Sequence, residues 1–591
     1  MNWFKNFKSK LSSDLDDEPL LDLEKNKSWC PVPWVTYSIN SLGQYRLCVQ
    51  ATSYKPEKNQ WQFEENTLKF TRGTLWESKD PNKEDNKPLN CATTNLTKMR
   101  NNAFLKEVRA YMLRGEQHPY CTRCNEEDAS KVQSRRMKDR KNFAYDGFTI
   151  NDAAKYTSAD GTIIDTTKIP LLAADIRLSN LCNQKCRMCY PGESTSWYQE
   201  WFDTHRVRHA LYVGQDSALI NSDHEKRLRG VIFFIKEDFP IENIPLPSFN
   251  GPGNTKIRLG LTDDKASVIE HELWDHEDLA QGKLLKTEKG DPYAWTDSRA
   301  LFERLHADSP DIEHIHMSGG EPLMITSHYE FLQGYVDNGK AKDITLNYNT
   351  NISNIPQRAL ELWKHFGLVQ LHPSIDGVGK VNEYIRHPSN WEIVLRNLRL
   401  LTEANKSKKI NLSIKTITTV QVYNILYLDE LAKAIVNFED IEIHDATLHM
   451  LHDPRYFNIR SLPSSVKDLA AERLSMIPLN VGIWEKQIQG VINYMYKEDT
   501  SETFGQFFIE TQIMDQYRKQ SFKTALPELH NVLKDHCIEY NEIVRLKKAL
   551  GLKQKESIIK VDQRGVRDAA DLQYTQIQVI HKEDPPWIKN K

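Results

Sequence analysis

Several features that would narrow the class of protein are missing from this chain of 591 residues. No apolar run approaches the roughly 20 residues that a membrane-spanning helix needs, and the N-terminus lacks the continuous apolar core of a secretory signal. Neither sign of charge dominates, because 78 Lys and Arg residues face 81 Asp and Glu residues. A general attraction to nucleic acid or anionic lipid is therefore not expected. We expect a cytoplasmic protein with no membrane or nucleic-acid partner.

Cysteine is also scarce, and its distribution argues against a disulfide scaffold. The chain has nine cysteines, an odd number that cannot pair completely, and no export signal accompanies them. The hydrophobic content of 39% and the aromatic content of 10% are typical of a globular protein. At roughly 150 residues per domain, the length suggests about four domain-sized units.

Three of the cysteines lie close together in the segment LCNQKCRMCY. Cys182, Cys186 and Cys189 have the spacing C-x3-C-x2-C. Three such thiolates can each bind one iron of a four-iron cluster, which leaves the fourth iron open to an outside ligand. A zinc knuckle is the alternative. Zinc normally recruits a fourth protein ligand, and the candidate, His205, would have to fold back onto the motif.

A second motif lies in HIHMSGGEPLM, at residues 314–324. An alternating apolar segment leads into Gly319 and Gly320, and glycines at a strand end allow the backbone to approach a ligand closely. Glu321 follows them and can accept a hydrogen bond from an amine. An ordinary strand-to-helix turn is the alternative for this pattern.

The order and strand context of these two motifs resemble the radical S-adenosylmethionine (radical SAM) superfamily, which carries C-x3-C-x2-C after its first strand and GGEP after its second. The resemblance implies that Cys182, Cys186 and Cys189 bind a [4Fe–4S] cluster whose open iron binds S-adenosylmethionine. It also implies contacts to that cofactor from later strand ends, where strand-end capping is the alternative and Ile352 stands in place of a family glycine. The implied cofactor-binding residues are Met188, Gly319, Gly320, Glu321, Asn351, Ser374, Asp376, Arg386, Thr419 and Asn424.

From about residue 165 to 455, short apolar strands alternate with amphipathic helices. The predicted strands lie within residues 170–179, 312–318, 343–351, 368–377, 410–419 and 441–449. Strands separated by helices pair in parallel through right-handed crossovers. We therefore expect an α/β fold, and the resemblance implies a partial (β/α)6 barrel with ligands at the C-terminal strand ends.

Two regions depart from a simple barrel. Roughly 130 residues separate Cys189 from Gly319, where the family usually has a few dozen, so we interpret residues 193–291 as an inserted subdomain. Aromatic residues near its start, such as Trp197 and Trp201, have the spacing of a helix that packs against the core. Residues 456–591 are predicted to be mainly helical with an extended tail, and Cys537 is expected to be a buried thiol.

The N-terminal cysteines form another pattern. The segment CPVPWVTYSINSLGQYRLC at residues 30–48, with CTRC at residues 121–124, resembles the SPASM and twitch domains of radical SAM enzymes. Those begin with C-x2-P-W, continue through a hairpin with a turn glycine, here Gly43, and end in C-x2-C after a helix, here residues 101–114. The family usually places this domain after the barrel, whereas residues 1–150 precede it. The resemblance implies an auxiliary [4Fe–4S] cluster held by Cys30, Cys48, Cys121 and Cys124.

Alternatives remain open for this N-terminal region. The same four cysteines could hold a structural zinc ion, because C-x2-C pairs serve zinc equally well. Cys91 could replace one of the ligands. The basic run at residues 131–143 is expected to be a solvated helix face, with a dock for an acidic substrate segment as the second interpretation.

The resemblance implies an enzyme, a radical SAM oxidoreductase or maturase. Such an enzyme reductively cleaves S-adenosylmethionine to a 5′-deoxyadenosyl radical, which abstracts a hydrogen atom from its substrate. We expect that substrate to be a peptide or protein side chain, and we expect an external one-electron donor such as flavodoxin or ferredoxin. The alternatives are oxidation of a small alcohol or sugar, or a non-catalytic scaffold protein stabilised by metal.

Overall fold

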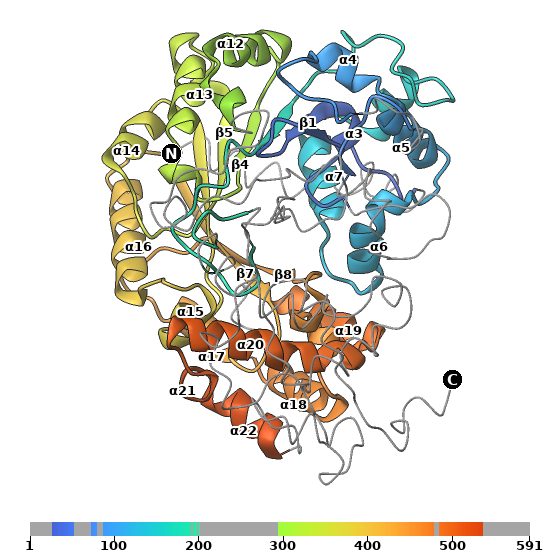
Figure 1. Ribbon diagram of the computed structural model, residues 1–591. Coiled ribbons are helices and arrows are strands. Elements are labelled where there is room, and N and C mark those ends of the chain that lie inside the picture. The colour runs from blue at the N-terminus through green and yellow to red at the C-terminus, as the bar shows by residue number, and fades with distance from the viewer. Residues whose placement is uncertain are drawn as a thin grey trace, which may run out of the picture.

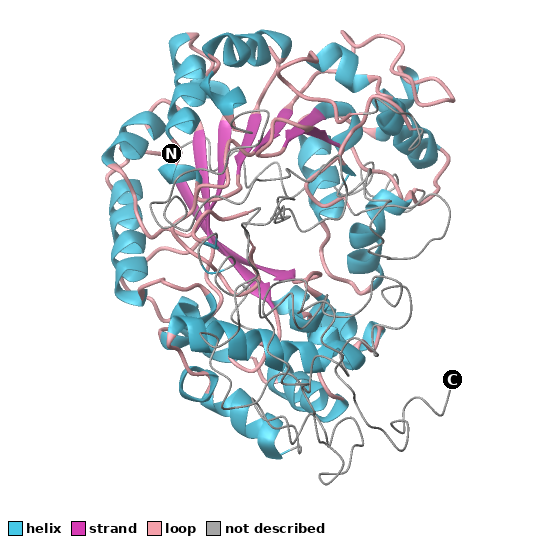
Figure 2. Ribbon diagram, viewed as in Figure 1, coloured by secondary structure: helices cyan, strands magenta, loops and turns pink. Residues whose placement is uncertain are grey.

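The computed structural model describes residues 26–51, 73–79, 87–190, 193–197, 200, 293–477 and 484–535. Almost all of the predicted insertion, the C-terminal tail, His205 and Cys537 lie outside these residues. The described part is an α/β fold built on one eight-stranded, mostly parallel sheet, with helices along its outer side (Figure 1, Figure 2).

The strand order across the sheet is β2-β1-β3-β4-β5-β6-β7-β8. The last six strands follow one another in chain order, and every pairing between them is parallel. These six are the strands that the sequence predicts, so the α/β class and the parallel pairing are confirmed. They are β3 (Ala173–Ile176), β4 (His314–Met317), β5 (Thr345–Thr350), β6 (Leu368–Pro373), β7 (Leu412–Val420) and β8 (Asp445–Met450).

Helices connect successive strands, and α12 (Arg299–Asp308) and α16 (Trp391–Lys406) begin at a residue whose side chain caps the first turn. The longest, α16, starts after Asn390, whose side chain accepts a hydrogen bond from the Ile393 N–H at 3.1 Å. Its buried residues recur every three or four positions, which places them on one face toward the core. The other connecting helices are α13 (Thr326–Asp337), α14 (Gln357–Trp363), α15 (Lys380–Ile385) and α17 (Leu428–Val436).

The two faces of the sheet differ in chemistry because successive side chains along a strand point to opposite sides. In β5, Leu346 and Tyr348 are fully buried, whereas Asn347 and Asn349 between them are partly exposed. The nine residues of β7 also alternate in burial, although Thr416 and Thr418 lie on its buried face and Ile417 on the partly exposed one. The apolar face packs against the outer helices and forms the core. The partly exposed polar residues therefore line the inner, concave face of the sheet (Figure 2).

The N-terminal segment extends this same sheet. β1 (Thr36–Ile39) pairs in parallel with β3 and antiparallel with β2 (Tyr45–Arg46). Gly43 lies in the hairpin turn with φ of +74°, a conformation that favours glycine. The hairpin expected from the sequence is therefore present. It forms an edge of the central sheet, so residues expected in a small N-terminal domain share their sheet with the six parallel strands β3 to β8.

Short helices follow this hairpin, and one of them differs from expectation. The basic run forms α7 (Arg135–Tyr145), and two of its arginines are buried rather than solvated. Arg136 pairs with Asp128, and Arg140 donates to the carbonyl oxygen of Asn26. The prediction of a solvated face is confirmed for Lys138, Lys141 and Asn142, which are exposed, and was wrong for Arg136 and Arg140. The neighbouring helices are α3 (Val32–Val35), α4 (Leu96–Arg100), α5 (Ala103–Leu113), α6 (Thr122–Ala129) and α8 (Ile150–Lys155).

The C-terminal region is helical as far as it is described, which agrees with the sequence. α18 (Ser464–Ser475), α19 (Glu485–Lys497), α20 (Phe504–Arg518), α21 (Phe522–Ala525) and α22 (Pro527–Asp535) lie below the sheet in Figure 1. Short 3₁₀ turns occupy Pro119–Cys121, Ala294–Asp297, Pro322–Met324, Ala341–Asp343, Arg455–Phe457, Ile459–Ser461 and Ser501–Thr503. Among the helices of the described ranges, none combines the length and apolar character needed to span a bilayer.

Candidate functional site

The loop after β3 carries the three-cysteine motif, and we call residues 180–190 the cysteine loop. The segment after α15 holds it from one side. The backbone N–H of Lys185 donates to His387 O at 2.7 Å, and that of Arg187 donates to Ile385 O at 2.8 Å. On the other side, the indole of Trp197 donates to Cys186 O at 3.2 Å. These contacts fix the backbone on both sides of the middle cysteine.

The two glycines after β4 allow the next loop to pack against the cysteine loop. A Cβ atom on Gly320 would lie 2.3 Å from the carbonyl oxygen of Leu181, closer than any side chain permits. Immediately after it, the Glu321 N–H donates to that same oxygen at 2.7 Å. Gly319 has φ of +83°, and a Cβ there would clash with the side chain of Arg177. The close backbone approach expected from the sequence is therefore present, and the cysteine loop is what it meets.

The carboxylate of Glu321 joins the ends of β4 and β5. It accepts hydrogen bonds from the Thr350 hydroxyl at 2.7 Å, from the Asn351 N–H at 2.7 Å and from the Leu323 N–H at 3.2 Å. Only 2% of the residue is exposed, and burial raises the pKa of Glu321 to about 7. Both carboxylate oxygens have protein partners, so Glu321 positions the two loops. Its contact with an amine stays a prediction.

An ion pair from the loop after β6 lies beside Cys186. Arg386 Nε is 2.9 Å from Asp376 Oδ2, and the same guanidinium approaches Cys186 Sγ at 3.9 Å. Asp376 is fully buried, which raises its pKa, while Arg386 opposes that increase. The other carboxylate oxygen of Asp376, Oδ1, accepts a hydrogen bond from the Thr419 N–H at 2.8 Å. The structure thus brings Asp376, Arg386 and Thr419 to one side of the three thiols.

The remaining predicted cofactor residues occupy different places. Asn351 lies next to the motif, because its amide donates to Cys182 Sγ at 3.9 Å and to Asn183 Oδ1 at 2.9 Å. Asn424 is fully buried and donates to Asp376 O at 3.0 Å and Thr419 O at 2.9 Å, so it joins the ends of β6 and β7. Ser374 sits at the parallel bridge between these strands, and Met188 packs against the core.

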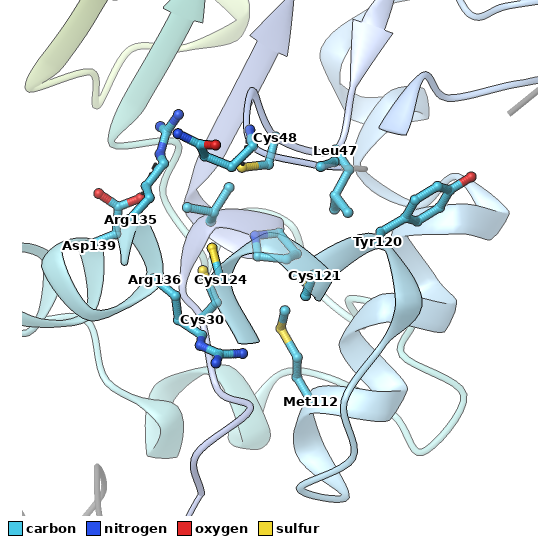
Figure 3. A pocket seen from close by; sticks show the side chains of 14 residues that line it. Cys30, Leu47, Cys48, Met112, Tyr120, Cys121, Cys124, Arg135, Arg136 and Asp139 are labelled. Atoms are coloured by element: carbon cyan, nitrogen blue, oxygen red, sulfur yellow. Dashed lines mark hydrogen bonds and ion pairs between the residues drawn. The ribbon is translucent and has the colours of Figure 1, made fainter. Parts of the chain in front are cut away.

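The four N-terminal cysteines line one cavity, shown in Figure 3. Cys30 precedes α3, Cys48 follows β2, and Cys121 and Cys124 lie at the start of α6. Burial raises the pKa of all four thiols. The sequence therefore predicted which residues come together. Cys91 does not line this cavity; it is buried elsewhere, which raises its pKa to about 12.

The spacing of the thiols bears on which metal would fit. Thiolates bound to one zinc ion at about 2.3 Å in a tetrahedron lie roughly 3.8 Å apart. Within the described residues, no three of these cysteine sulfurs all lie within 4.8 Å of one another, in either group. A four-iron cluster requires wider spacing because each thiolate binds a different iron. All-thiol donor sets suit an iron–sulfur cluster, and a single zinc ion would require these thiols to move closer together.

The sequence analysis missed a polar network on the concave face of the sheet. Arg135 of α7 lines the four-cysteine cavity and also lies 2.7 Å from Asp175 of β3. The other oxygen of Asp175 is 3.0 Å from Nδ1 of His316 on β4. Histidine and asparagine at alternate positions within the predicted strands carried this signal, because those positions face away from the outer helices.

A second missed feature is the contact between the cysteine loop and α20. Arg187 forms a buried ion pair with Asp515, and its guanidinium lies 3.5 Å from the centre of the Tyr384 ring. Nearby, the buried Glu200 pairs with Lys185 at 2.8 Å and with Arg518 at 2.9 Å. The C-terminal helices therefore hold the cysteine loop through buried charges.

Comparison with known proteins agrees with this geometry. The family model of the Radical SAM superfamily matches residues 282–435, which run from just before α12 almost to the end of α17. No curated protein sequence gives a significant match. The family match supports the radical SAM superfamily, which implies an enzyme with a [4Fe–4S] cluster, reductive cleavage of S-adenosylmethionine and radical chemistry. The cysteine motif itself precedes the matched residues.

Replacing Arg187 by Met should destabilise the protein by about 3 kcal/mol, because Asp515 would keep its buried charge without its guanidinium partner. The denaturation midpoint of reconstituted protein measures this effect. Arg299→Gln is the matched control, since the Arg299 side chain is 91% exposed and its loss should change stability by less than about 0.5 kcal/mol. Equal midpoints for Arg187→Met and the control would contradict the structural role of this contact.

Proposed function

We propose that this chain is a radical SAM enzyme whose catalytic cluster is bound by Cys182, Cys186 and Cys189. The observation that carries the proposal is the convergence of three strand-end loops on a C-x3-C-x2-C motif, next to residues that match the superfamily. The bound cluster and cofactor would supply one-electron cleavage of S-adenosylmethionine to a 5′-deoxyadenosyl radical that abstracts a substrate hydrogen.

The chain's own groups would hold these components and balance their charge. Burial raises the pKa of the three thiols, so metal binding must release their protons. The Arg386 guanidinium beside Cys186 favours the thiolate form. We assign Met188, Gly319, Gly320, Glu321, Asn351, Ser374, Thr419 and Asn424 to the surroundings of S-adenosylmethionine, directly or through the loops that they position. An external donor such as flavodoxin or ferredoxin would deliver the electron in the cytoplasm.

Replacing all three motif cysteines by Ala should abolish formation of 5′-deoxyadenosine under dithionite, because the open-iron site would lose its ligands. Chromatographic measurement of 5′-deoxyadenosine after anaerobic reconstitution tests this. The Cys91→Ala variant is the control, since Cys91 lies outside both cysteine groups. Undiminished cleavage in the triple variant would refute the assignment. Absence of cleavage in the wild-type protein would favour the scaffold alternative.

We further propose that Cys30, Cys48, Cys121 and Cys124 hold an auxiliary [4Fe–4S] cluster, in the manner of SPASM and twitch domains. Two observations support this: the four thiols line one cavity, and no three of their sulfurs lie as close together as a single zinc ion would hold them. Four protein ligands would leave no iron open. Arg135, which lines the same cavity, would offset part of the negative charge of four thiolates.

The metal content distinguishes the two sites. Reconstituted wild-type protein should carry about eight irons, and either the triple-Ala variant of the motif or the quadruple-Ala variant of the cavity should carry about four. Iron and zinc analysis with Mössbauer spectroscopy measures this. About four irons and one zinc ion in the wild-type protein would replace the auxiliary cluster with a structural zinc site and leave the catalytic assignment standing.

We propose a peptide or protein side chain as the substrate, with a small alcohol or sugar as the competing class. The support is analogy to peptide-modifying relatives with SPASM or twitch domains, together with a broad concave polar face. Deuterium transfer into 5′-deoxyadenosine decides between the classes. Label from a candidate polypeptide is expected, and label from small alcohols or sugars with none from polypeptides would overturn the proposal.

A further inference from the structure

Two lysines near the concave face of the sheet lie close enough for their charges to interact. Lys415 occupies a partly exposed position in the middle of β7, and Lys138 lies on α7, one turn after Arg135. Among the described residues, no carboxylate oxygen lies within 4.0 Å of either ammonium group. By contrast, the nearby charged residues Arg135, Asp139 and Asp175 form ion pairs with one another.

Contacts at both ends of α7 place Lys138 over this face. Near its start, Arg135 is 2.7 Å from Asp175 of β3. At its end, Asp146 is 2.9 Å from Nε2 of His314 on β4. Residues three apart share one side of a helix, so Lys138 faces the sheet together with Arg135.

The strand register supplies neutral polar groups next to Lys415. Leu371 of β6 pairs with Ile414 of β7, so the following residues, His372 and Lys415, are also neighbours. His372 pairs in turn with Asn349 of β5, and its Nδ1 lies 3.3 Å from Asn349 Oδ1. Burial, followed by the charge of Lys138, lowers the pKa of His372, so the imidazole is neutral and can donate or accept.

The nearby acids are engaged elsewhere. Asp175 and Asp139 both pair with Arg135, and Asp175 also contacts His316. Asp445 is the register partner of Lys415, but it is exposed at the start of β8 and accepts the Ala446 N–H at 2.8 Å. Surrounding protein lowers the pKa of Lys138, and Lys415 lowers it further, although water still reaches the side chain. Lys138 is thus an exposed residue whose positive charge and that of Lys415 repel each other.

We propose that Lys138 and Lys415 bind an anionic group of the substrate, a carboxylate or a phosphate, with His372 and Asn349 as neutral hydrogen-bonding partners. An anion between the two ammonium groups replaces their repulsion with two attractions, and each ammonium offers three donors. The identification of this anion as part of a substrate rests on the proposed function. The inference adds a chemical requirement, a negative charge, to whichever substrate class is correct.

Binding of small anions to reconstituted protein tests the site without knowledge of the substrate. The probes are inorganic phosphate and succinate, titrated by calorimetry at constant ionic strength. We expect saturable binding of at least one probe. The probe that binds with the higher affinity indicates whether the substrate carries a phosphate or a carboxylate. Lys138→Gln and Lys415→Gln should each weaken that binding about tenfold or more, as expected for loss of a charged hydrogen bond.

Two control variants separate charge recognition from misfolding. Lys141→Gln alters an exposed lysine of the same helix and should leave anion binding unchanged. Lys138→Arg keeps the positive charge and should retain most of the binding. The denaturation midpoint in chloride checks the fold of each variant. Binding that survives in both glutamine variants, or no saturable binding by the folded wild-type protein, would overturn the inference.

The two proposals fail separately. Formation of 5′-deoxyadenosine by the wild-type protein reports the proposed function and requires no substrate anion. Cleavage of S-adenosylmethionine without lysine-dependent anion binding would refute only the inference. Lysine-dependent binding without cleavage would support the anion site and contradict the proposed function.

Discussion

The packing of the loop after β4 against the cysteine loop is the contact on which the candidate catalytic site depends. At Gly320 the two backbones are so close that a Cβ would lie 2.3 Å from Leu181 O, and the next N–H donates to that oxygen. Glu321 then carries the connection to the end of β5, and Asp376 and Asn424 join the ends of β6 and β7. Each of these polar groups thus forms hydrogen bonds to the backbone of a neighbouring strand end. A rigid set of strand ends is what allows short loops to present three thiols and Arg386 together.

Burial of charge recurs around this contact. Arg187, Arg518 and Glu200 are almost inaccessible, yet each has an oppositely charged partner from a distant part of the chain. Such pairs contribute little net stability compared with apolar packing, but breaking one leaves an uncompensated charge. A different docking of α20 on the cysteine loop would leave these buried charges without partners, which disfavours it.

Local patterns explain what the sequence could predict. Alternating apolar residues indicated the six parallel strands, and the spacing of Cys182, Cys186 and Cys189 indicated a metal-binding loop before any geometry was known. Each of these patterns lies within a short segment of the sequence, so it can be recognised without knowledge of the fold. Pairing of β1 with β3 involves segments more than 130 residues apart, so no local pattern revealed that the N-terminal hairpin joins the central sheet. The burial of Arg136 and Arg140 in α7 was missed for the same reason, because the groups that bind them come from other parts of the chain.

Ile352 is an instructive intermediate case. It stands where the family has glycine, and its φ of +44° is indeed one that glycine adopts readily and a β-branched residue rarely does. The strain is offset locally, since the side chain is fully buried, the N–H donates to the Thr350 hydroxyl and the carbonyl accepts from Asn397 at 2.7 Å. Ile352 therefore differs from the family's glycine in its side chain but adopts a backbone conformation typical of glycine. That backbone conformation places Asn351 beside Cys182.

Arg135 is where the four-cysteine cavity and the concave face of the sheet come into electrostatic contact. It lines the four-cysteine cavity, lowers the pKa of Cys48 against the stronger effect of burial, and pairs with Asp175 on the concave face. Charges at these separations interact strongly where protein excludes water. A change in charge within the cavity must therefore alter the field at Asp175 and His316, on the strands that lead to the cysteine loop and to Gly319. The N-terminal region is in this sense part of the same polar interior as strands β3 to β8, with which it shares a sheet.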